Sequence, residues 1–354
     1  MTKSLDRIFK FGKFLSLTPT YAHPQITLFL KLYALLVALS ITAALATTMT
    51  KRNFYYMKSA VGGLLDANLL AFNYSTVAVI FCKCEQWHRL VFNLKIVVAN
   101  LKPTTISHRI CIFVVVQLVG VVIIVASLQT WLELLGIEFL QKHHVQYFQL
   151  YLLFTYNTFL CVIASLILAM YRRLSLSLSH VNTTIFKDLQ RTVKTLDNFL
   201  HFLKDTVDIF NDIFGWPIAL SVSYTTLHIL NDCYSIFLRS SFYKNDDNIA
   251  RKLTADVSLA LLFFIGTVVL IIICDSILIE AEKILSLSQK LRKKFKRSGP
   301  QVRDNLFAFG NSVIENFPKF SAARFFEIKR SIILRILGTI TTFLIVMIQF
   351  RLNV

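Results

Sequence analysis

Long runs of apolar residues dominate the chain, and each is close to the length that crosses a lipid bilayer. Because one helical span needs about 20 predominantly apolar residues, the pattern predicts seven spans. They lie near residues 26–48, 60–82, 110–132, 147–170, 213–237, 255–279 and 333–351. Polar residues interrupt the second run (Asp66, Asn68 and Asn73) and the fifth (His228, Asn231 and Asp232). The sequence therefore predicts an all-α integral membrane protein with a single transmembrane domain over residues 1–354.

Two segments between the predicted spans have the spacing of amphipathic helices. From Met170 to Asp212, apolar residues recur at steps of three and four with charged residues between them. After the sixth span, similar spacing continues into the basic run from Leu291 to Arg297, which ends before Pro300. We expect spans four and six to continue as helices beyond the bilayer, with their apolar faces packed together as an anchor bundle.

Basic residues are distributed unevenly between the two sides of this arrangement. Of the 38 Lys and Arg, 27 fall before the first span or in the segments after spans two, four and six. Positive charge prefers the cytosolic side, so the pattern predicts a cytosolic N-terminus and, after seven crossings, an extracellular C-terminus. This orientation is the reverse of a G-protein-coupled receptor, and the Asp-Arg-Tyr and Asn-Pro-x-x-Tyr motifs of those receptors are missing from the sequence.

Composition supports a membrane protein over the alternatives. The chain is 55% hydrophobic and 16% charged, and its net charge of +18 comes from the segments between apolar runs. Anionic lipid accounts for that excess, so no nucleic-acid partner is expected. We find no nucleophile and base set, no Cys-x-x-Cys pair and no phosphate loop, which disfavours an enzyme or a cofactor. His143 and His144 are predicted to lie in a short outer loop with too few ligands for a metal.

Near the end of the chain, Thr342 and Phe343 are followed by five apolar residues and then Gln349 and Phe350. This ending resembles that of the insect gustatory receptors, which have Thr-Tyr, five apolar residues and Gln-Phe. The one departure is Phe343, which keeps the ring of Tyr and loses its hydroxyl. Two further segments match the family pattern, namely Phe320 to Ser331 before the last span, and Asn211, Phe214 and Gly215 at the start of the fifth.

The last span has a polar stripe on an otherwise apolar helix. Thr339, Thr342, Val346 and Gln349 fall within a stripe about 80° wide. Taken alone, such residues favour hydrogen bonds to neighbouring helices. The resemblance implies instead that four subunits surround one pore lined by this span. On that basis we assign Gln349 and Phe350 to the gate.

Three more residues of the last span, Thr342, Ile345 and Val346, are expected in the wall of this pore. An apolar ring that dewets when it is narrow would close it.

A polar and aromatic set in the outer halves of spans two to six predicts a ligand pocket open to the outside. Its members are Asp66, Gln129, Trp131, Tyr151, Tyr156, Tyr224, His228 and Asp232. Asp66 is the strongest candidate, because a carboxylate inside a membrane is costly. Trp131 and Tyr151 also fit an interfacial aromatic belt. His228 and Asp232, four residues apart, also fit an internal hydrogen-bonded pair.

The resemblance implies a chemosensory, ligand-gated, non-selective cation channel in the plasma membrane of sensory neurons. It would be a homotetramer, or a heterotetramer with related receptors, and its partners would be lipid and a small-molecule tastant. Sugar-sensing relatives often have Glu after the Thr-Tyr pair, and Leu344 at that position favours a bitter or other apolar tastant. The alternative is a non-conducting or metabotropic seven-span receptor, or a companion subunit of a receptor complex.

Overall fold

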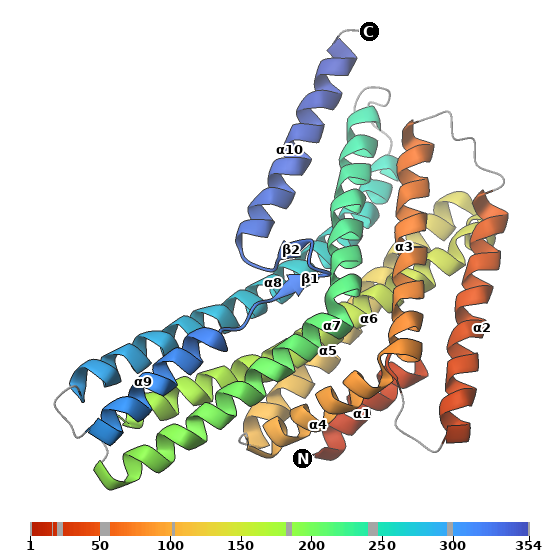
Figure 1. The fold of residues 1–354 in the computed structure, drawn as a ribbon. Helices are drawn as coiled ribbons and strands as arrows, with labels where there is room; N and C mark the ends of the chain where they lie inside the picture. Colours follow the sequence, from red (N-terminus) through yellow and green to blue (C-terminus); the bar gives the residue numbers. More distant parts are fainter. Residues whose placement is uncertain are drawn as a thin grey trace.

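The computed structural model describes residues 2–15, 17–19, 24–49, 57–100, 103–181, 186–239, 247–295 and 300–352. Over these ranges the chain forms ten helices and one two-stranded hairpin (Figure 1). They are α1 (Thr2–Phe14), α2 (Pro24–Met49), α3 (Met57–Cys82), α4 (Cys84–Asn100), α5 (Pro103–Leu135), α6 (Ile137–Val181), α7 (Phe186–Arg239), α8 (Asp247–Lys294), α9 (Pro300–Glu315), β1 (Ser321–Ala322), β2 (Phe326–Glu327) and α10 (Ser331–Leu352).

Each of the seven predicted apolar runs lies inside one helix, in the order α2, α3, α5, α6, α7, α8 and α10. Among the described residues, five of these helices (α3, α5, α6, α7 and α8) are long and apolar enough to cross a membrane. The described apolar parts of α2 and α10 are shorter, 28–44 and 331–346. Helix α1 and the end of α10 lie at opposite ends of the molecule (Figure 1), and which end faces the cytosol stays a prediction.

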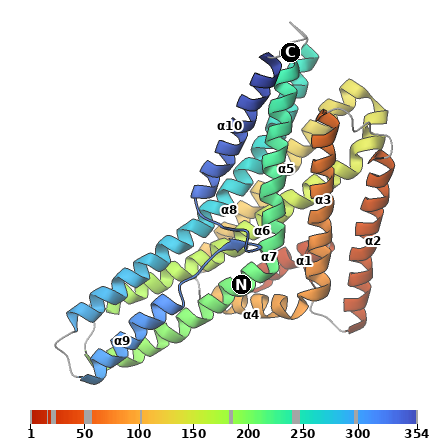
Figure 2. The same cartoon turned by 45° about the horizontal axis from the view of Figure 1, so that its top comes forward.

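Helices α6, α7 and α8 extend far beyond an apolar span. They have 45, 54 and 48 residues, whereas about 20 suffice to cross a bilayer. Their distal parts pack side by side with α9 in both ribbon views (Figure 1, Figure 2). Described leucines of the Met170 to Asp212 pattern are buried here, with Leu178 only 1% and Leu203 0% exposed. The cytosolic position of this bundle stays a prediction.

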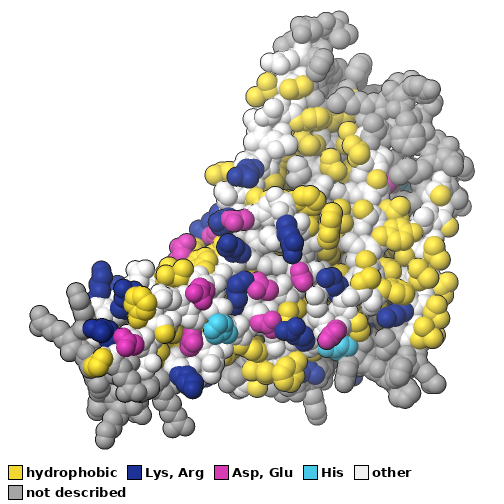
Figure 3. Space-filling model, in the orientation of Figure 1, with side chains coloured by type: hydrophobic (Ala, Val, Ile, Leu, Met, Phe, Trp, Pro, Cys, Tyr) yellow, Lys and Arg dark blue, Asp and Glu magenta, His cyan; other side chains and the backbone are white. Residues whose placement is uncertain are grey.

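Charge is divided along the molecule in the way that a membrane protein requires. Charged side chains gather in the lower half of the surface drawn in Figure 3, while hydrophobic side chains cover the right-hand side, where α2 and α3 run. Large apolar side chains are exposed on α2 and α5, for example Leu36 at 65% and Val122 at 65%. Large exposed apolar patches need a partner, and lipid is the partner for helices of this length.

Helix α7 bends where its apolar run begins, and the hairpin packs against the bend. Pro217 lies inside α7, and because proline removes one backbone hydrogen bond and crowds the preceding turn, it accounts for the kink. The Asn211 side chain, six residues earlier, donates to the Lys319 carbonyl (2.5 Å) and accepts from the Ser321 amide (3.2 Å). These bonds fix β1 to α7.

The hairpin turn has a strained backbone. Ala323 and Arg324 have positive φ angles of 50° and 64°, a region that costs energy for residues other than glycine. Beyond the turn, Lys329 hydrogen-bonds Glu327 and lowers the pKa of that carboxyl below its usual value. Arg330 then pairs with Asp275 of α8 at 2.6 Å. The chain therefore enters α10 held to both α7 and α8.

One local prediction is wrong. His143 and His144 lie inside α6, not in a loop, because that helix begins at Ile137, directly after Gly136 with a φ of 74°. Hydropathy marks only the apolar part of a helix, so its polar first turns were assigned to a loop. Hydropathy makes no prediction for the segment after α3, which forms the helix α4 with Leu90 and Leu94 fully buried.

Candidate functional site

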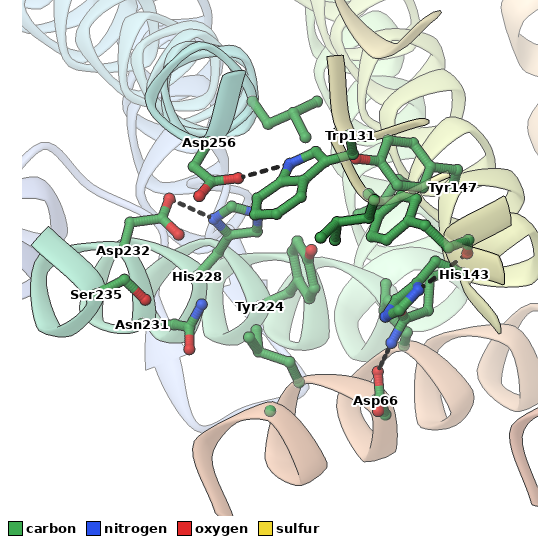
Figure 4. Close-up of a pocket in the computed structure, with 18 residues that line it drawn as sticks. Asp66, Trp131, His143, Tyr147, Tyr224, His228, Asn231, Asp232, Ser235 and Asp256 are labelled. Carbon is green, nitrogen blue, oxygen red and sulfur yellow. Dashed lines mark hydrogen bonds and ion pairs between the residues drawn. The ribbon is translucent and has the colours of Figure 1, made fainter. Parts of the chain in front are cut away.

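A pocket of about 380 Å³ lies among α3, α5, α6, α7 and α8 (Figure 4). Polar and aromatic lining residues are Asp66 from α3; Trp131 from α5; His143, Gln146 and Tyr147 from α6; Tyr224, His228, Asn231, Asp232 and Ser235 from α7; and Asp256 from α8. The five α7 residues recur at steps of one, three and four, which places them on one helical face. Five helices therefore have to pack correctly before the pocket exists.

Three carboxylates line this pocket, each on a different helix. Asp66 accepts a hydrogen bond from the Gln146 amide. Asp232 pairs with Nδ1 of His228 at 3.0 Å, and Asp256 accepts from the Trp131 indole N–H at 3.1 Å. In Figure 4, Asp232 and Asp256 lie together on one side of the cavity and Asp66 on the other. Two of the three carboxylates thus have a neutral group as the partner in these bonds.

Aromatic rings form much of the remaining wall. Trp131 stacks on Phe139 with 5.5 Å between centroids, and Phe139 stacks on His143 at 4.3 Å. Tyr224 contacts both His228 and Phe263 edge to face. The Tyr147 hydroxyl lies 3.3 Å from Ser127 Oγ. Rings with a few orienting polar groups are typical of small-molecule sites.

The structure brings five of the eight predicted ligand residues together at this pocket, namely Asp66, Trp131, Tyr224, His228 and Asp232. Gln129 instead lies exposed on α5 and donates to Glu133 at 3.0 Å. Tyr151 is half-buried against the core. Tyr156 is 0% exposed and packs between Phe72 (5.3 Å) and Phe214 (6.0 Å). These three do not line the pocket.

Sequence reasoning missed other lining residues. Among them, Asp256 and Gln146 take part in the hydrogen bonds of the pocket described above. Asp256 is the second residue of the sixth predicted span, where a charge looks like an ordinary helix end. The rule that makes an intramembrane carboxylate a functional candidate applies to it equally and would have found it. Gln146 was missed because its turn of α6 was assigned to a loop.

Helix α10 exposes the residues that were predicted to line a pore. Ile332, Ile336 and Ile340 are buried against the rest of the chain, so this face of α10 is occupied. Thr342, Ile345, Val346 and Gln349 are all exposed, Ile345 to 50% and Val346 to 39%. The Phe350 side chain lies outside the described residues.

Metal binding has no support in the described part of the chain. No group of three or more His, Cys, Asp or Glu residues there could hold a metal ion. The six cysteines are free thiols.

The apolar helices, the pocket among them and the last helix with one exposed face are the features of a multi-pass helical membrane protein. A family model described as 7tm chemosensory receptor matches residues 5–354. The chain belongs to this family, which consists of receptors and not of enzymes.

The fold is similar to that of the insect olfactory receptor OR5 from Machilis hrabei. Its complex with eugenol matches with a TM-score of 0.73 at 12% sequence identity, covering 99% of this chain and 98% of that chain. A second structure of OR5 matches with a TM-score of 0.68 at 11% identity, with the same coverage. No curated protein sequence matches the chain. At these identities the likeness is one of fold.

Proposed function

We propose that the protein is a chemosensory receptor that acts as a ligand-gated, non-selective cation channel in the plasma membrane of sensory neurons. A small molecule occupies the pocket among α3 and α5 to α8, and α10 lines the pore of a tetramer. Membership of the chemosensory receptor family supports the sensory role, and a solved structure of similar fold holds a small molecule, eugenol.

The observation that carries the channel proposal is the open face of α10. Thr342 and Gln349 are exposed on a helix that otherwise reads as a membrane span. Polar side chains within a span face protein or water in preference to lipid. When subunits assemble around a central axis, Thr342 and Gln349 face both protein and water, because each α10 contacts the α10 of a neighbouring subunit and lines a water-filled pore.

The pocket and α10 are connected through α7, which supports a gating mechanism. Tyr224 and His228 line the pocket, and Gly215 and Asn211 of the same helix hold the hairpin that leads into α10. A ligand opens the pore only through a higher affinity for the open arrangement. A small outward movement of four α10 helices then wets an apolar constriction.

The test is to express the chain alone and with related subunits, and to record current while sugars, alkaloids and lipids are applied. Gln349→Ala, Phe350→Ala and Thr342→Val should alter basal current or ion preference without removing protein from the cell surface. Thr341→Val is the matched control, because Thr341 is exposed on α10 about 100° away from Thr342.

Unchanged current in all three variants, Gln349→Ala, Phe350→Ala and Thr342→Val, would remove α10 from the pore. Silence in every subunit combination, with normal surface protein, would favour the non-conducting or companion receptor.

Orientation has its own test. The proposed channel has a cytosolic N-terminus and an extracellular C-terminus. An epitope tag after Val354 should be labelled by antibody on intact cells, and one before Met1 only after permeabilisation. The opposite labelling would place the pocket on the cytosolic side and overturn the sensory proposal.

A further inference from the structure

We propose that the chain binds the headgroup of an anionic phospholipid at a basic cluster formed by Arg109 of α5, Arg172 of α6 and Lys283 of α8. The lipid phosphate lies among these three side chains, and the acyl chains lie along the apolar faces of α5 and α8. The site is separate from the pocket, so the inference does not depend on the proposed channel or on its ligand.

The basic cluster carries more positive charge than the described residues around it neutralise. Among those residues, the only ion-pair partner of the three side chains is Glu280 of α8. Its carboxylate lies 3.8 Å from Nε of Arg172 and 3.8 Å from Nζ of Lys283, and both distances are longer than a hydrogen bond. At shorter range, Glu280 accepts a hydrogen bond from Ser175 Oγ at 2.8 Å. Three cations therefore share one carboxylate.

Arg109 is the member of the cluster that water neutralises least. It is half-buried and donates to the backbone carbonyl of Ser165 on α6. Ser165 and Arg172 lie two turns apart on one face of that helix. Desolvation by burial and the charge of Arg172 both lower the pKa of Arg109 below its usual value. A partly desolvated cation needs an anion, and the anion expected here lies between the two arginines.

Phosphate suits this position because of the chemistry of arginine. A guanidinium has five N–H donors in a fixed fork, and Arg109 uses one of them in the bond to α6 described above. Arginine binds phosphate through two parallel hydrogen bonds, each strengthened by charge. The donors that remain on Arg109 and Arg172 therefore fit the oxygens of one phosphate group.

The basic cluster lies at the level where the apolar spans end. The apolar part of α5 begins directly after Arg109, at Cys111. The predicted fourth span ends near residue 170, just before Arg172, and the predicted sixth span ends near residue 279, one turn before Lys283. Lipid headgroups lie at the ends of the apolar spans, and basic pockets between membrane helices bind them.

Two exposed apolar faces lead from the cluster along the spans. On α5, Val116 is exposed two turns from Arg109 on the same face. On α8, Ile272 and Ile279 are exposed on the side that ends at Lys283. An acyl chain buries apolar area against these faces, whereas a soluble phosphate does not. The source of the phosphate is therefore a lipid, and the excess of positive charge selects an anionic lipid over a zwitterionic one.

The experiment titrates the purified full chain in detergent with phosphatidylserine or with phosphatidylcholine, and measures bound lipid by native mass spectrometry. The two lipids have the same acyl chains, so they differ only in the headgroup. One basic residue near a membrane surface changes the affinity for anionic lipid by about fivefold. We expect the parent chain to prefer phosphatidylserine by about this factor or more.

Three variants assign the preference to the basic cluster. Arg109→Gln and Arg172→Gln should each weaken phosphatidylserine binding about fivefold and leave phosphatidylcholine binding unchanged. Arg172 is 55% exposed, so Arg172→Gln keeps the test valid where gel filtration shows that Arg109→Gln fails to fold. Arg173→Gln is the matched control, because it removes the same charge one residue away. Arg173 lines a different cavity, between α6 and α7, and its replacement should change neither affinity.

Equal binding of the two lipids by the parent chain would overturn the proposal. Loss of phosphatidylserine binding in Arg173→Gln as large as in Arg172→Gln would also overturn it, because binding would then follow overall charge and not this cluster. A preference that both cluster variants retain would have the same meaning. Glycerophosphoserine, which has the headgroup without acyl chains, should not displace phosphatidylserine at equal concentration. Displacement would assign the cluster to a soluble anion.

Discussion

Gly215 should be the position where the smallest substitution does the most damage to the junction between α7 and α10. A Cβ atom added there would lie 2.8 Å from the Ala323 amide nitrogen and 3.2 Å from its Cα. Both atoms belong to backbone, which cannot rotate away as a side chain can. Asn211 also ties this part of the hairpin to α7, so the hairpin cannot move without losing those bonds.

The change in the free energy of unfolding that Gly215→Ala causes follows from two opposing effects. Replacing glycine by alanine inside a helix stabilises it by about 1 kcal/mol, while forcing an extra methyl group into a packed contact costs roughly 1 to 3 kcal/mol. Gly310→Ala separates the two, because Gly310 is also inside a helix, α9, and an added Cβ there meets nothing within 4 Å. The difference between the two variants should therefore be about 1 to 3 kcal/mol, with Gly310→Ala the more stable.

Thermal unfolding of both purified variants in the same detergent checks this difference. Gly310→Ala should unfold at or above the temperature of the parent chain, and Gly215→Ala at least several degrees below Gly310→Ala. Equal unfolding temperatures would show that the hairpin does not approach α7 this closely. Where the variant reaches the membrane, Gly215→Ala should also change gating, because it displaces the segment that leads into α10.

Two further predictions concern single buried or paired groups. Tyr156→Phe should raise the unfolding temperature, because the buried Tyr156 hydroxyl has no hydrogen-bond partner in the described part of the chain. Such an unpaired group costs about 1 to 3 kcal/mol. A lower unfolding temperature would reveal a partner for the hydroxyl, and a lost ligand response would show that Tyr156 belongs to the pocket. Asp275→Asn should destabilise the chain by about 1 kcal/mol or less, because Arg330 is 59% exposed and solvent screens the pair. A double-mutant cycle with Arg330→Gln checks that value, and a coupling energy well above about 1 kcal/mol would contradict the screening by solvent.

The course of the helices was largely predictable from hydropathy. Every apolar run lies inside one helix. Between Met170 and Asp212 the described leucines at steps of three and four are buried where helices pack, namely Leu174, Leu178, Leu196, Leu200 and Leu203. Local spacing determines which face of a helix is apolar, and burial of that face follows. The helical segments outside the apolar runs, such as α4 and the first turns of α6, could not be predicted from hydropathy. Hydropathy identifies residues that face lipid, and these segments need not be apolar.

The sequence predicted which helices contribute to the pocket, but not which of their residues line it. The residues Asn211, Phe214 and Gly215 were singled out by a resemblance, without any physical reason for their pattern. The structure supplies the reason, since Asn211 and Gly215 both contact the hairpin, a segment more than 100 residues away. Which polar residues share a pocket depends equally on distant packing, and this is why Asp256 was missed while Gln129 was included.

Two separate helices join the pocket to the start of α10, and this limits how a ligand in the pocket can act on the proposed pore. On α7, nine residues separate Tyr224 in the pocket from Gly215 at the hairpin, a rise of about 14 Å. On α8, Asp256 in the pocket and Asp275 at Arg330 are 19 residues apart, about 28 Å.

A helix transmits a shift along its axis because its hydrogen bonds resist compression, whereas Pro217 lets the upper part of α7 tilt on its own. We therefore expect ligand binding to tilt α7 and to leave α8 as the fixed support. On that basis Gly215→Ala should change the response at saturating ligand more strongly than Asp275→Asn does. The reverse order would make α8 the moving element.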